Sequence, residues 1–257
     1  MGLINFDHSY TEDLGHKFLK ILERAGFSLM AEQVEHPGKQ FCRFIMFNKA
    51  GSGKKKRKGS YLEFVDIGRG GERINKPGLS LRYEGSLKKH FSSLKNKCGI
   101  KADYIHKNYN WKEESKRILP GWNFITFKRP RFKNIYLWFT EYELRPGIKK
   151  LPKISHRNTA ESIYGLELCL KKSDQARLGE ILKKNVAAEE LDFDGLKLFL
   201  KKSVQTKISS IIVSCRSLKH FENISKISAK YLWRGEKAAI IKNPDKRMWD
   251  IIVVEKH

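Results

Sequence analysis

One stretch of the chain, "FNKAGSGKKKRKGSYLEF", carries residue types that bind phosphate. Gly53 and Lys54 look like the end of a phosphate-binding loop, which has the pattern G-x-x-x-x-G-K followed by Ser or Thr. Here Lys55 stands in place of that hydroxyl residue, and Asn48 stands in place of the first glycine. The residues that follow alternate like a strand, so no helix N-terminus can present its backbone amides to a phosphate. The stretch is therefore not a phosphate-binding loop of this kind.

What remains is a polar loop between two predicted antiparallel strands. Gly51, Gly53 and Gly59 supply permissive backbone angles, and the lysines repel one another and stay hydrated. We expect residues 49–59 to be exposed and mobile. A nuclear address or a nucleic-acid patch is the alternative interpretation of the basic residues 54–58, although such runs arise easily in a basic chain.

The chain as a whole is strongly basic. It has 52 Lys and Arg against 28 Asp and Glu, a formal net charge of +24 and a sequence pI near 9.9. Such a charge attracts polyanions, whether nucleic acid, acidic lipid or anionic small molecules. The basic residues are scattered, however, and recur as doublets such as Lys88-Lys89 and Lys201-Lys202. This distribution is more typical of a solvated surface than of a nucleic-acid reading head.

Length and cysteine usage point to an ordinary intracellular domain. With 257 residues, 40% of them hydrophobic, the chain can bury a substantial core. The four cysteines form no C-x-x-C pair, which argues against a zinc ribbon or a redox pair. The start of the sequence lacks the pattern of a signal peptide, and no apolar run approaches membrane-spanning length. We expect a cytoplasmic protein without a membrane partner.

The elements that would position any functional side chain follow a repeated order. The strand-like run "LINFDHSY" precedes a helix over "TEDLGHKFLKILERAGF", in which Leu14, Phe18 and Leu22 recur at helical spacing. Thr11 or Asp13 can cap the start of this helix. Three further strand-like runs, "SLMAEQVEH", "QFCRFIMFN" and "SYLEFVDIG", complete a strand–helix–strand–strand–strand unit.

The same order recurs three more times. A second unit runs from "GLSLRYE" through the helix "SLKKHFSSLKNKCG" to "NIYLWFTEYE", and two compressed units begin at "SIYGLELCLKK" and "KISSIIVSC". The repetition is one of structural order and not of sequence. The segment "ELRPGIKKLPKISHRNTAES" contains Pro and Gly and predicts a boundary near residue 155.

Several short motifs in residues 4–67 resemble a glyoxalase-like domain of the vicinal oxygen chelate superfamily. They are "FDHSY" in the first strand, "ERAGFSL" at the end of the helix, "EHPGKQFCRFIMF" and "SYLEFVDI", in the order and spacing of that superfamily. "WFTEYELRP" followed by "SHRNTAESIYGLEL" also looks like the end of such a domain. Beyond about residue 170 the resemblance rests on the order of strands and helices alone.

This resemblance implies an α+β fold built from tandem βαβββ modules, which form curved, mostly antiparallel sheets with helices on the outside. Residues 1–155 would form a glyoxalase-like domain of two modules, and residues 156–257 a C-terminal pair of compressed, related modules. In this superfamily two modules pair to make a half-open sheet that holds a divalent metal ion.

Carried over to this chain, the resemblance places metal ligands at His8 on the first strand and Glu63 on the fourth. The second module has no histidine on its first strand, where Leu79 or Ser80 stands near the ligand position. Its last strand offers Glu141 as the best third ligand. Imidazole and carboxylate ligands would suit Zn, Ni, Fe or Mn.

Trp138 and Arg82 are the candidate ligand-binding residues beside this site, and the sequence identifies no catalytic residue. A structural role is the alternative for both proposed ligands. His8 can be a hydrogen-bonded, half-buried histidine, and Glu63 can satisfy a buried backbone group or a lysine.

Three functions are compatible with these observations. The first is a small-molecule enzyme, a metal-dependent lyase, isomerase or dioxygenase, since the fold does not choose among these reactions. The second is a metal-free module that binds or sequesters a small anionic ligand, which the incomplete ligand set and the positive charge support. The third is non-specific nucleic-acid binding, which rests on charge and on the basic and aromatic residues 127–133 without a recognised motif. The oligomeric state is left open.

Overall fold

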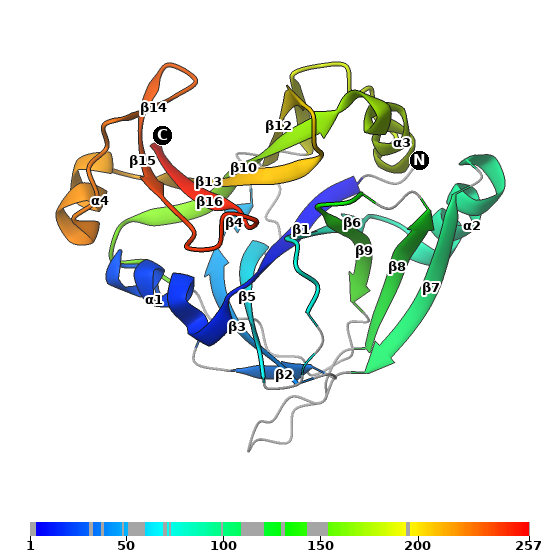
Figure 1. The fold of residues 1–257 in the computed structure, drawn as a ribbon, viewed down its shortest axis with the longest axis horizontal. Helices are drawn as coiled ribbons and strands as arrows, with labels where there is room; N and C mark the ends of the chain where they lie inside the picture. Colours follow the sequence, from blue (N-terminus) through cyan, green and yellow to red (C-terminus); the bar gives the residue numbers. More distant parts are fainter. Residues whose placement is uncertain are drawn as a thin grey trace.

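The computed structural model describes most of residues 4–256. The segments that it does not describe within this range are 31–32, 37–38, 48, 51–59, 69–70, 72, 99, 109–120, 130–131, 143–153 and 194–195. Two curved sheets stacked against each other dominate the described chain, and the helices lie at their outer sides (Figure 1).

The first sheet contains eight strands in the order β2-β3-β5-β1-β6-β9-β8-β7. One βαβββ module supplies half of them and a second module supplies the other half. The first module gives β1 (Ile4–Glu12), β2 (Val34–His36), β3 (Gln40–Phe47) and β5 (Ser60–Ile67); the second gives β6 (Gly78–Tyr83), β7 (Lys101–Asn108), β8 (Gly121–Arg129) and β9 (Tyr136–Tyr142). The first strands of the modules, β1 and β6, pair antiparallel, and each runs parallel to the last strand of its own module. The two modules are therefore related by an approximate twofold axis.

The second sheet repeats this arrangement in the order β11-β12-β10-β13-β16-β15-β14. Its strands are β10 (Ala160–Lys171), β11 (Glu190–Phe193), β12 (Leu196–Ser203), β13 (Lys207–Cys215), β14 (Tyr231–Trp233), β15 (Glu236–Ile241) and β16 (Asp250–Glu255). The first strands β10 and β13 again pair antiparallel, and each again runs parallel to the last strand of its module. Among the described residues the third module has three strands and the fourth has four, so compression of both modules stays a prediction. The predicted α+β fold of tandem modules is confirmed.

In the described part of the chain, four helices pack on the convex sides of the sheets. They are α1 (Lys17–Arg24), α2 (Leu87–Cys98), α3 (Lys172–Leu182) and α4 (Leu218–Ser225), and a short 3-10 turn, η1 (Leu14–His16), precedes α1. The Asp13 carboxylate accepts the backbone N–H groups of Phe18 and Leu19, each at 2.8 Å, so Asp13 caps this helix as expected. No helix among the described residues is long and apolar enough to cross a membrane.

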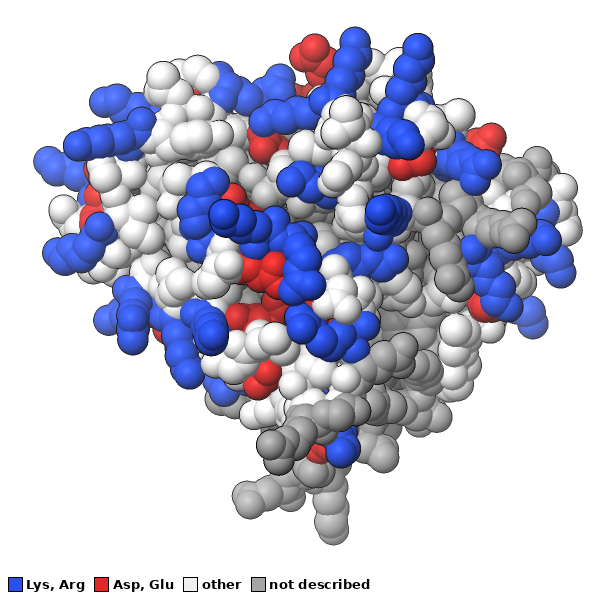
Figure 2. All heavy atoms as spheres, viewed as in Figure 1, with Lys and Arg blue, Asp and Glu red and all other residues white. Residues whose placement is uncertain are grey.

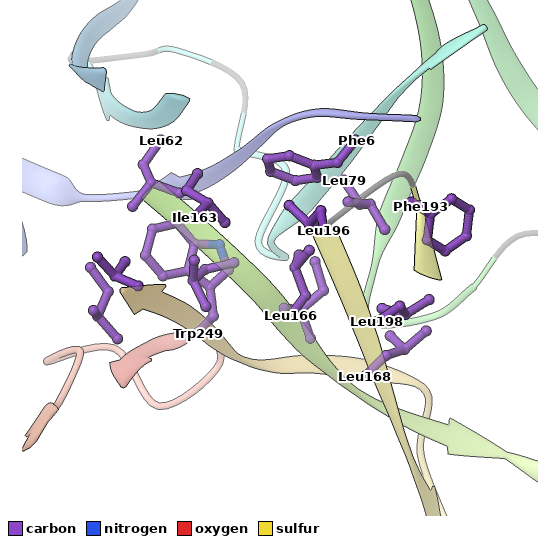
Figure 3. Packing of buried hydrophobic residues seen from close by; sticks show 14 of the residues in the cluster. Phe6, Leu62, Leu79, Ile163, Leu166, Leu168, Phe193, Leu196, Leu198 and Trp249 are labelled. Carbon is purple, nitrogen blue, oxygen red and sulfur yellow. The ribbon is translucent and has the colours of Figure 1, made fainter. Parts of the chain in front are cut away.

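One continuous hydrophobic core fills the space between the two sheets. Phe6, Leu62 and Leu79 from the first sheet face Ile163, Leu166 and Leu198 from the second (Figure 3). Trp249, which is fully buried, lies at one end of this cluster and donates its indole N–H to the Tyr10 carbonyl at 3.1 Å. Because the inner faces of both sheets are mainly apolar, His8 on β1 and Glu167 on β10 are left to the opposite, concave faces.

The boundary predicted near residue 155 falls between the last strand of the first sheet and the first strand of the second. Strand β4 (Lys49–Ala50) crosses this division and pairs with β10. The core also spans both halves. The division into domains of residues 1–155 and 156–257 stays a prediction.

Residues 51–59, which contain the lysine run, lie outside the described part of the chain. The flanking strands β3 and β5 are adjacent and antiparallel as expected, with Phe47 opposite Ser60. The pattern of the sequence did not reveal β11 and β14, which have four and three residues. Strands this short carry too few alternating residues to produce a periodic signal.

A buried histidine joins the two halves. His156 accepts the Ser28 N–H at Nδ1 (3.0 Å) and donates from Nε2 to the Met46 carbonyl (3.1 Å), and its ring packs against Phe27 and Phe47. Burial lowers the pKa of His156 to about 4, from an ordinary value of 6.5. A second proton would have to enter at Nδ1, facing the Ser28 N–H, so the folded protein keeps this histidine neutral.

His156→Ala should lower the free energy of unfolding at neutral pH by about 1–3 kcal/mol, because it leaves two backbone groups without partners. The depressed pKa means that the unfolded chain binds the proton first, so the contribution of His156 is present above pH 6.5 and lost as the pH falls toward 4. Urea denaturation at pH 7 and pH 5 should therefore show that the free energy of unfolding falls less on acidification in the variant than in the natural chain. His220→Ala, which removes an exposed histidine, is the control. An unchanged pH dependence in His156→Ala would contradict this assignment.

Candidate functional site

A β-bulge on β1 brings two consecutive polar side chains to the concave face of the first sheet. Phe6 pairs with Leu81 and His8 pairs with Ser80, so Asp7 is an extra residue between two regular pairs. Phe6 points into the core, whereas the Asp7 carboxylate reaches the ring of its neighbour His8. A regular strand would have sent Asp7 and His8 to opposite faces.

Asp7 is the centre of a hydrogen-bond network. Its carboxylate, which is fully buried, accepts from His8 Nδ1 at 2.7 Å, from the Tyr142 hydroxyl at 2.7 Å and from the Arg82 guanidinium. Tyr61 extends the network through its hydroxyl, 3.1 Å from that of Tyr142. Three of these partners come from strands other than β1, so the network fastens the two modules to each other.

His8 lies between two carboxylates. Its Nδ1 contacts Asp7, and its Nε2 lies 3.4 Å from the Glu63 carboxylate on β5. The imidazole ring stacks on Tyr61 with centroids 4.3 Å apart, and the edge of Trp138 meets it at 5.3 Å. The structure thus brings together His8, Glu63 and Trp138, which the sequence proposed as neighbours.

These contacts decide the charges of the network. Burial alone would lower the pKa of His8, but its hydrogen bonds to Asp7 and Glu63 raise it to about 9. Burial alone would raise the pKa of Asp7, but the charge of Arg82 and the hydrogen bond from His8 lower it to about 2. At neutral pH the site therefore holds an imidazolium and a guanidinium on either side of the Asp7 carboxylate.

Aromatic and apolar side chains surround the charged groups. Tyr10, Phe44 and Trp138 form a buried cluster on the concave face with Cys42 and other residues. The Tyr10 ring lies flat against Gly78, where an added Cβ would come within 1.9 Å of the ring, so only glycine fits there. The low polarity of these walls strengthens the electrostatic interactions inside them.

The twofold relation between the modules identifies the counterparts of His8 and Glu63 in the second module. His8 lies opposite Tyr61, two residues before Glu63, just as Ser80 lies opposite Trp138, two residues before Thr140. The equivalent positions are therefore Ser80 and Thr140, whose hydroxyls bond to each other at 2.9 Å and are buried.

Glu141, the proposed third ligand, is not part of this cluster. Its carboxylate accepts the Leu87 N–H at 3.1 Å, at the start of α2, and an amide N–H of Asn123 at 3.2 Å. Residues alternate along β9, and its neighbour Thr140 already points to the concave face. Glu255 on β16 makes a bond of the same kind, accepting the Leu218 N–H at the start of α4 at 2.8 Å, so carboxylates cap the starts of both helices.

The donor set does not fit the three-ligand divalent metal site that the fold implies. His8 and Glu63 present an imidazole and a carboxylate, and Asp7 holds the His8 ring as an outer carboxylate commonly does for a metal-binding histidine. The two positions that would complete the set carry the neutral hydroxyls of Ser80 and Thr140. Among the described residues, no group of three or more His, Cys, Asp or Glu side chains could hold a metal ion.

The basic and aromatic segment 127–133 does not form an exposed stacking surface in its described part. Phe132 is buried in the core, and Phe127 packs against the same cluster. Arg131 lies outside the described residues.

Sequence reasoning missed Asp7, Tyr61 and Tyr142 as members of the site. Asp7 is visible in the sequence as part of "FDHSY", but a regular strand places neighbouring residues on opposite faces and so gives no reason to group it with His8. No local pattern marks a bulge here, since the extra residue is defined by pairing with β6. Tyr61 and Tyr142 resemble the many other aromatic residues on strands until the strand order places them beside His8.

No protein-family model matches the sequence, and no curated protein is detectably similar to it. Solved structures are similar over 99% of this chain. A hypothetical protein from Staphylococcus aureus is matched over all of its length, with a TM-score of 0.61 and 11% identity. Homoprotocatechuate 2,3-dioxygenase from Arthrobacter globiformis is matched over 80% of its length (TM-score 0.55, 8% identity). The Mn(II)-bound glyoxalase from Novosphingobium aromaticivorans is matched over 83% (TM-score 0.54, 8% identity). Together with the four-module topology, these similarities show that the chain has the glyoxalase-like fold of the vicinal oxygen chelate superfamily.

Proposed function

We propose that the first sheet binds a small anionic molecule on its concave face without a resident metal ion, and that His8 and Arg82 anchor it. The observation that carries this proposal is the Asp7 carboxylate, which holds both cations in fixed positions in a buried, aromatic-walled site. Ionisable groups with shifted pKa values in such a place mark functional sites more often than other parts of a protein.

Both cations retain capacity for an oxyanion. Arg82 uses one terminal nitrogen on Asp7, and its Nε is buried without a hydrogen-bond partner. The His8 Nε2–H reaches Glu63 only at 3.4 Å, which is long for an N–H···O bond. A carboxylate or phosphate oxygen of a ligand can therefore take over this N–H and pair with the guanidinium.

A metal-dependent enzyme like the glyoxalase and dioxygenase neighbours is the second candidate. The Asp7–His8–Glu63 arrangement favours it, because an oriented imidazole faces a carboxylate as in a metal site. The Ser80 and Thr140 hydroxyls count against it, so we rank metal-free binding first.

A substitution of Glu63 distinguishes metal-free anion binding from a metal-dependent site. Glu63→Gln should tighten anion binding, because it removes the negative charge that competes for His8 Nε2, whereas a metal site would lose a ligand and weaken. Arg82→Gln should weaken anion binding about tenfold, the value of one charge-assisted hydrogen bond. Sodium acetate, oxalate and phosphate can be titrated into chelator-treated protein while the ring nitrogens of His8 are followed by NMR.

Arg216→Gln, which removes an exposed arginine paired with Glu161 on the second sheet, is the matched control. Loss of binding in Glu63→Gln, or a stoichiometric divalent metal in protein purified without chelator, would replace the proposal with the metal-dependent alternative. Absence of any response of the His8 ring to the three anions would refute it.

Ser80→His should complete a three-ligand metal site with His8 and Glu63. Its side chain lies opposite His8 on the neighbouring strand, so a histidine there would add a third ligand to His8 and Glu63. The variant should bind Ni²⁺ or Zn²⁺ at least about tenfold more tightly than the parent, measured by calorimetry. Ser210→His is the control, because Ser210 lies opposite Glu167 in the second sheet, where no histidine is present. Equal metal affinity in the two variants would contradict the positional equivalence.

The charge of His8 has a measurable effect on stability. The pKa of His8 is raised from 6.5 to about 9 in the folded state. Its contribution to the free energy of unfolding is therefore complete below pH 6.5 and is lost as the pH rises through 9. The His8 ring should stay doubly protonated at pH 8 by ¹⁵N NMR. Asp7→Asn should lower the free energy of unfolding by about 3–5 kcal/mol, because it leaves buried cations uncompensated. In this variant the free energy of unfolding should also fall less between pH 6.5 and 9. A His8 ring that titrates near 6.5 in the natural chain would contradict this.

A further inference from the structure

The second sheet carries charged residues at the positions that His8 and Glu63 occupy in the first, with the signs exchanged. Glu167 lies opposite Ser210 and Phe199, as His8 lies opposite Ser80 and Tyr61. Lys201 follows Phe199 by two residues, as Glu63 follows Tyr61, and its ammonium lies 2.6 Å from the Glu167 carboxylate. The anion is here the buried partner and the cation is accessible, with side-chain exposures of 4% and 47%.

A hairpin holds a further cation over the same face. The Trp233 indole donates to Glu167 at 2.8 Å, and its ring meets Phe199 edge-on at 4.9 Å, so the β14–β15 edge of the sheet contacts side chains of its central strands. Arg234 and Gly235 form the two-residue turn between these strands, and both have positive φ angles, 50° and 83°. Arginine is uncommon in the left-handed region, where Asn or Gly is the usual choice. The turn instead places the Arg234 guanidinium 5.0 Å from the centre of the Phe199 ring.

Two lysines complete the group. Lys197 on β12 and Lys256 beyond β16 lie 5.9 Å and 5.2 Å from the centre of the Tyr164 ring, which is 6.2 Å from that of Phe199. Three cations, Lys197, Arg234 and Lys256, thus gather around two adjacent aromatic rings. Lys201 is the fourth cation of this group, through its ion pair with Glu167. Lys and Arg side chains crowd the upper part of the molecule in Figure 2, where β12, β14 and β15 lie in Figure 1.

We infer that this face of the second sheet is a binding site for a compact polyanion that carries several phosphate groups. The carboxylates that now pair with Lys197 and Lys256 are Glu190 and Glu236, which are 37% and 51% exposed. Exposed ion pairs add little stability, so phosphate oxygens can replace these carboxylates. Glu167 is the exception, because it is buried and keeps Lys201 and Trp233 in place.

The arrangement fits a compact ligand better than a nucleic-acid strand. The cations converge on one pair of rings and do not follow a track along the sheet. Phe199 and Trp233 are only 2% and 3% exposed, so they cannot stack on successive bases as single-strand binding requires.

Sodium tripolyphosphate is the probe, titrated by calorimetry at an ionic strength of about 0.15 M to suppress diffuse attraction. We expect one molecule to bind per chain, and the double variant Arg234→Gln/Lys256→Gln should weaken binding at least about tenfold. The matched control is Lys219→Gln/Lys242→Gln, which removes the same charge from exposed positions on α4 and just after β15. Circular dichroism verifies that each variant is folded.

Three results would overturn the inference. The first is the absence of saturable binding of tripolyphosphate to the natural chain. The second is equal weakening in the test and control variants, which would mean that overall charge and not this site attracts the anion. The third is binding of a single-stranded oligothymidylate that depends on Arg234 and Lys256 while tripolyphosphate does not bind. The site lies on the second sheet, so its failure would leave the function proposed for the first sheet untouched.

Discussion

The buried carboxylate of Asp7 is the group on which the organisation of the first sheet's site depends. A buried carboxylate is costly unless it is compensated, and here it is compensated by His8, Arg82 and Tyr142. These partners belong to three different strands, β1, β6 and β9. The network therefore links the two modules across their central seam and fixes the protonation state of the histidine at the same time. The aromatic cluster around it excludes water and makes each of these interactions stronger.

The two sheets have the same strand arrangement but different residue types at equivalent positions of their concave faces. Pairing registers between first and last strands are the same, so positions on the two concave faces correspond one to one. His8 and Glu63 on one sheet become Glu167 and Lys201 on the other, and Ser80 and Ser210 keep the same residue type. A fold constrains the geometry of such positions and leaves their residue types to vary, which is why similarity of fold does not transfer an activity.

The core between the sheets explains why the two proposed binding sites lie on the concave faces. The inner faces are occupied by apolar side chains from both sheets, and the hydrogen bond from Trp249 to the Tyr10 carbonyl ties the second sheet to the strand that bears the site. His156 adds a second tie through Ser28 and Met46. Both contacts join residues more than 100 positions apart, so the stability of the first sheet depends on the second.

The sequence by itself determined the modules, since strand alternation, helical stripes and caps such as Asp13 are local properties of the chain. It also placed His8 and Glu63 on strands, and Trp138 and Arg82 near them. Only the tertiary structure decided which faces these residues share. The bulge that turns Asp7 toward His8 exists only in the pairing of β1 with β6. The pairing of β9 with β6 likewise decides that Thr140, and not its neighbour Glu141, faces the site. The short strands β11 and β14, the exchanged charge pair of the second sheet and the Ser80–Thr140 pair likewise follow from contacts between distant segments, which local patterns do not encode.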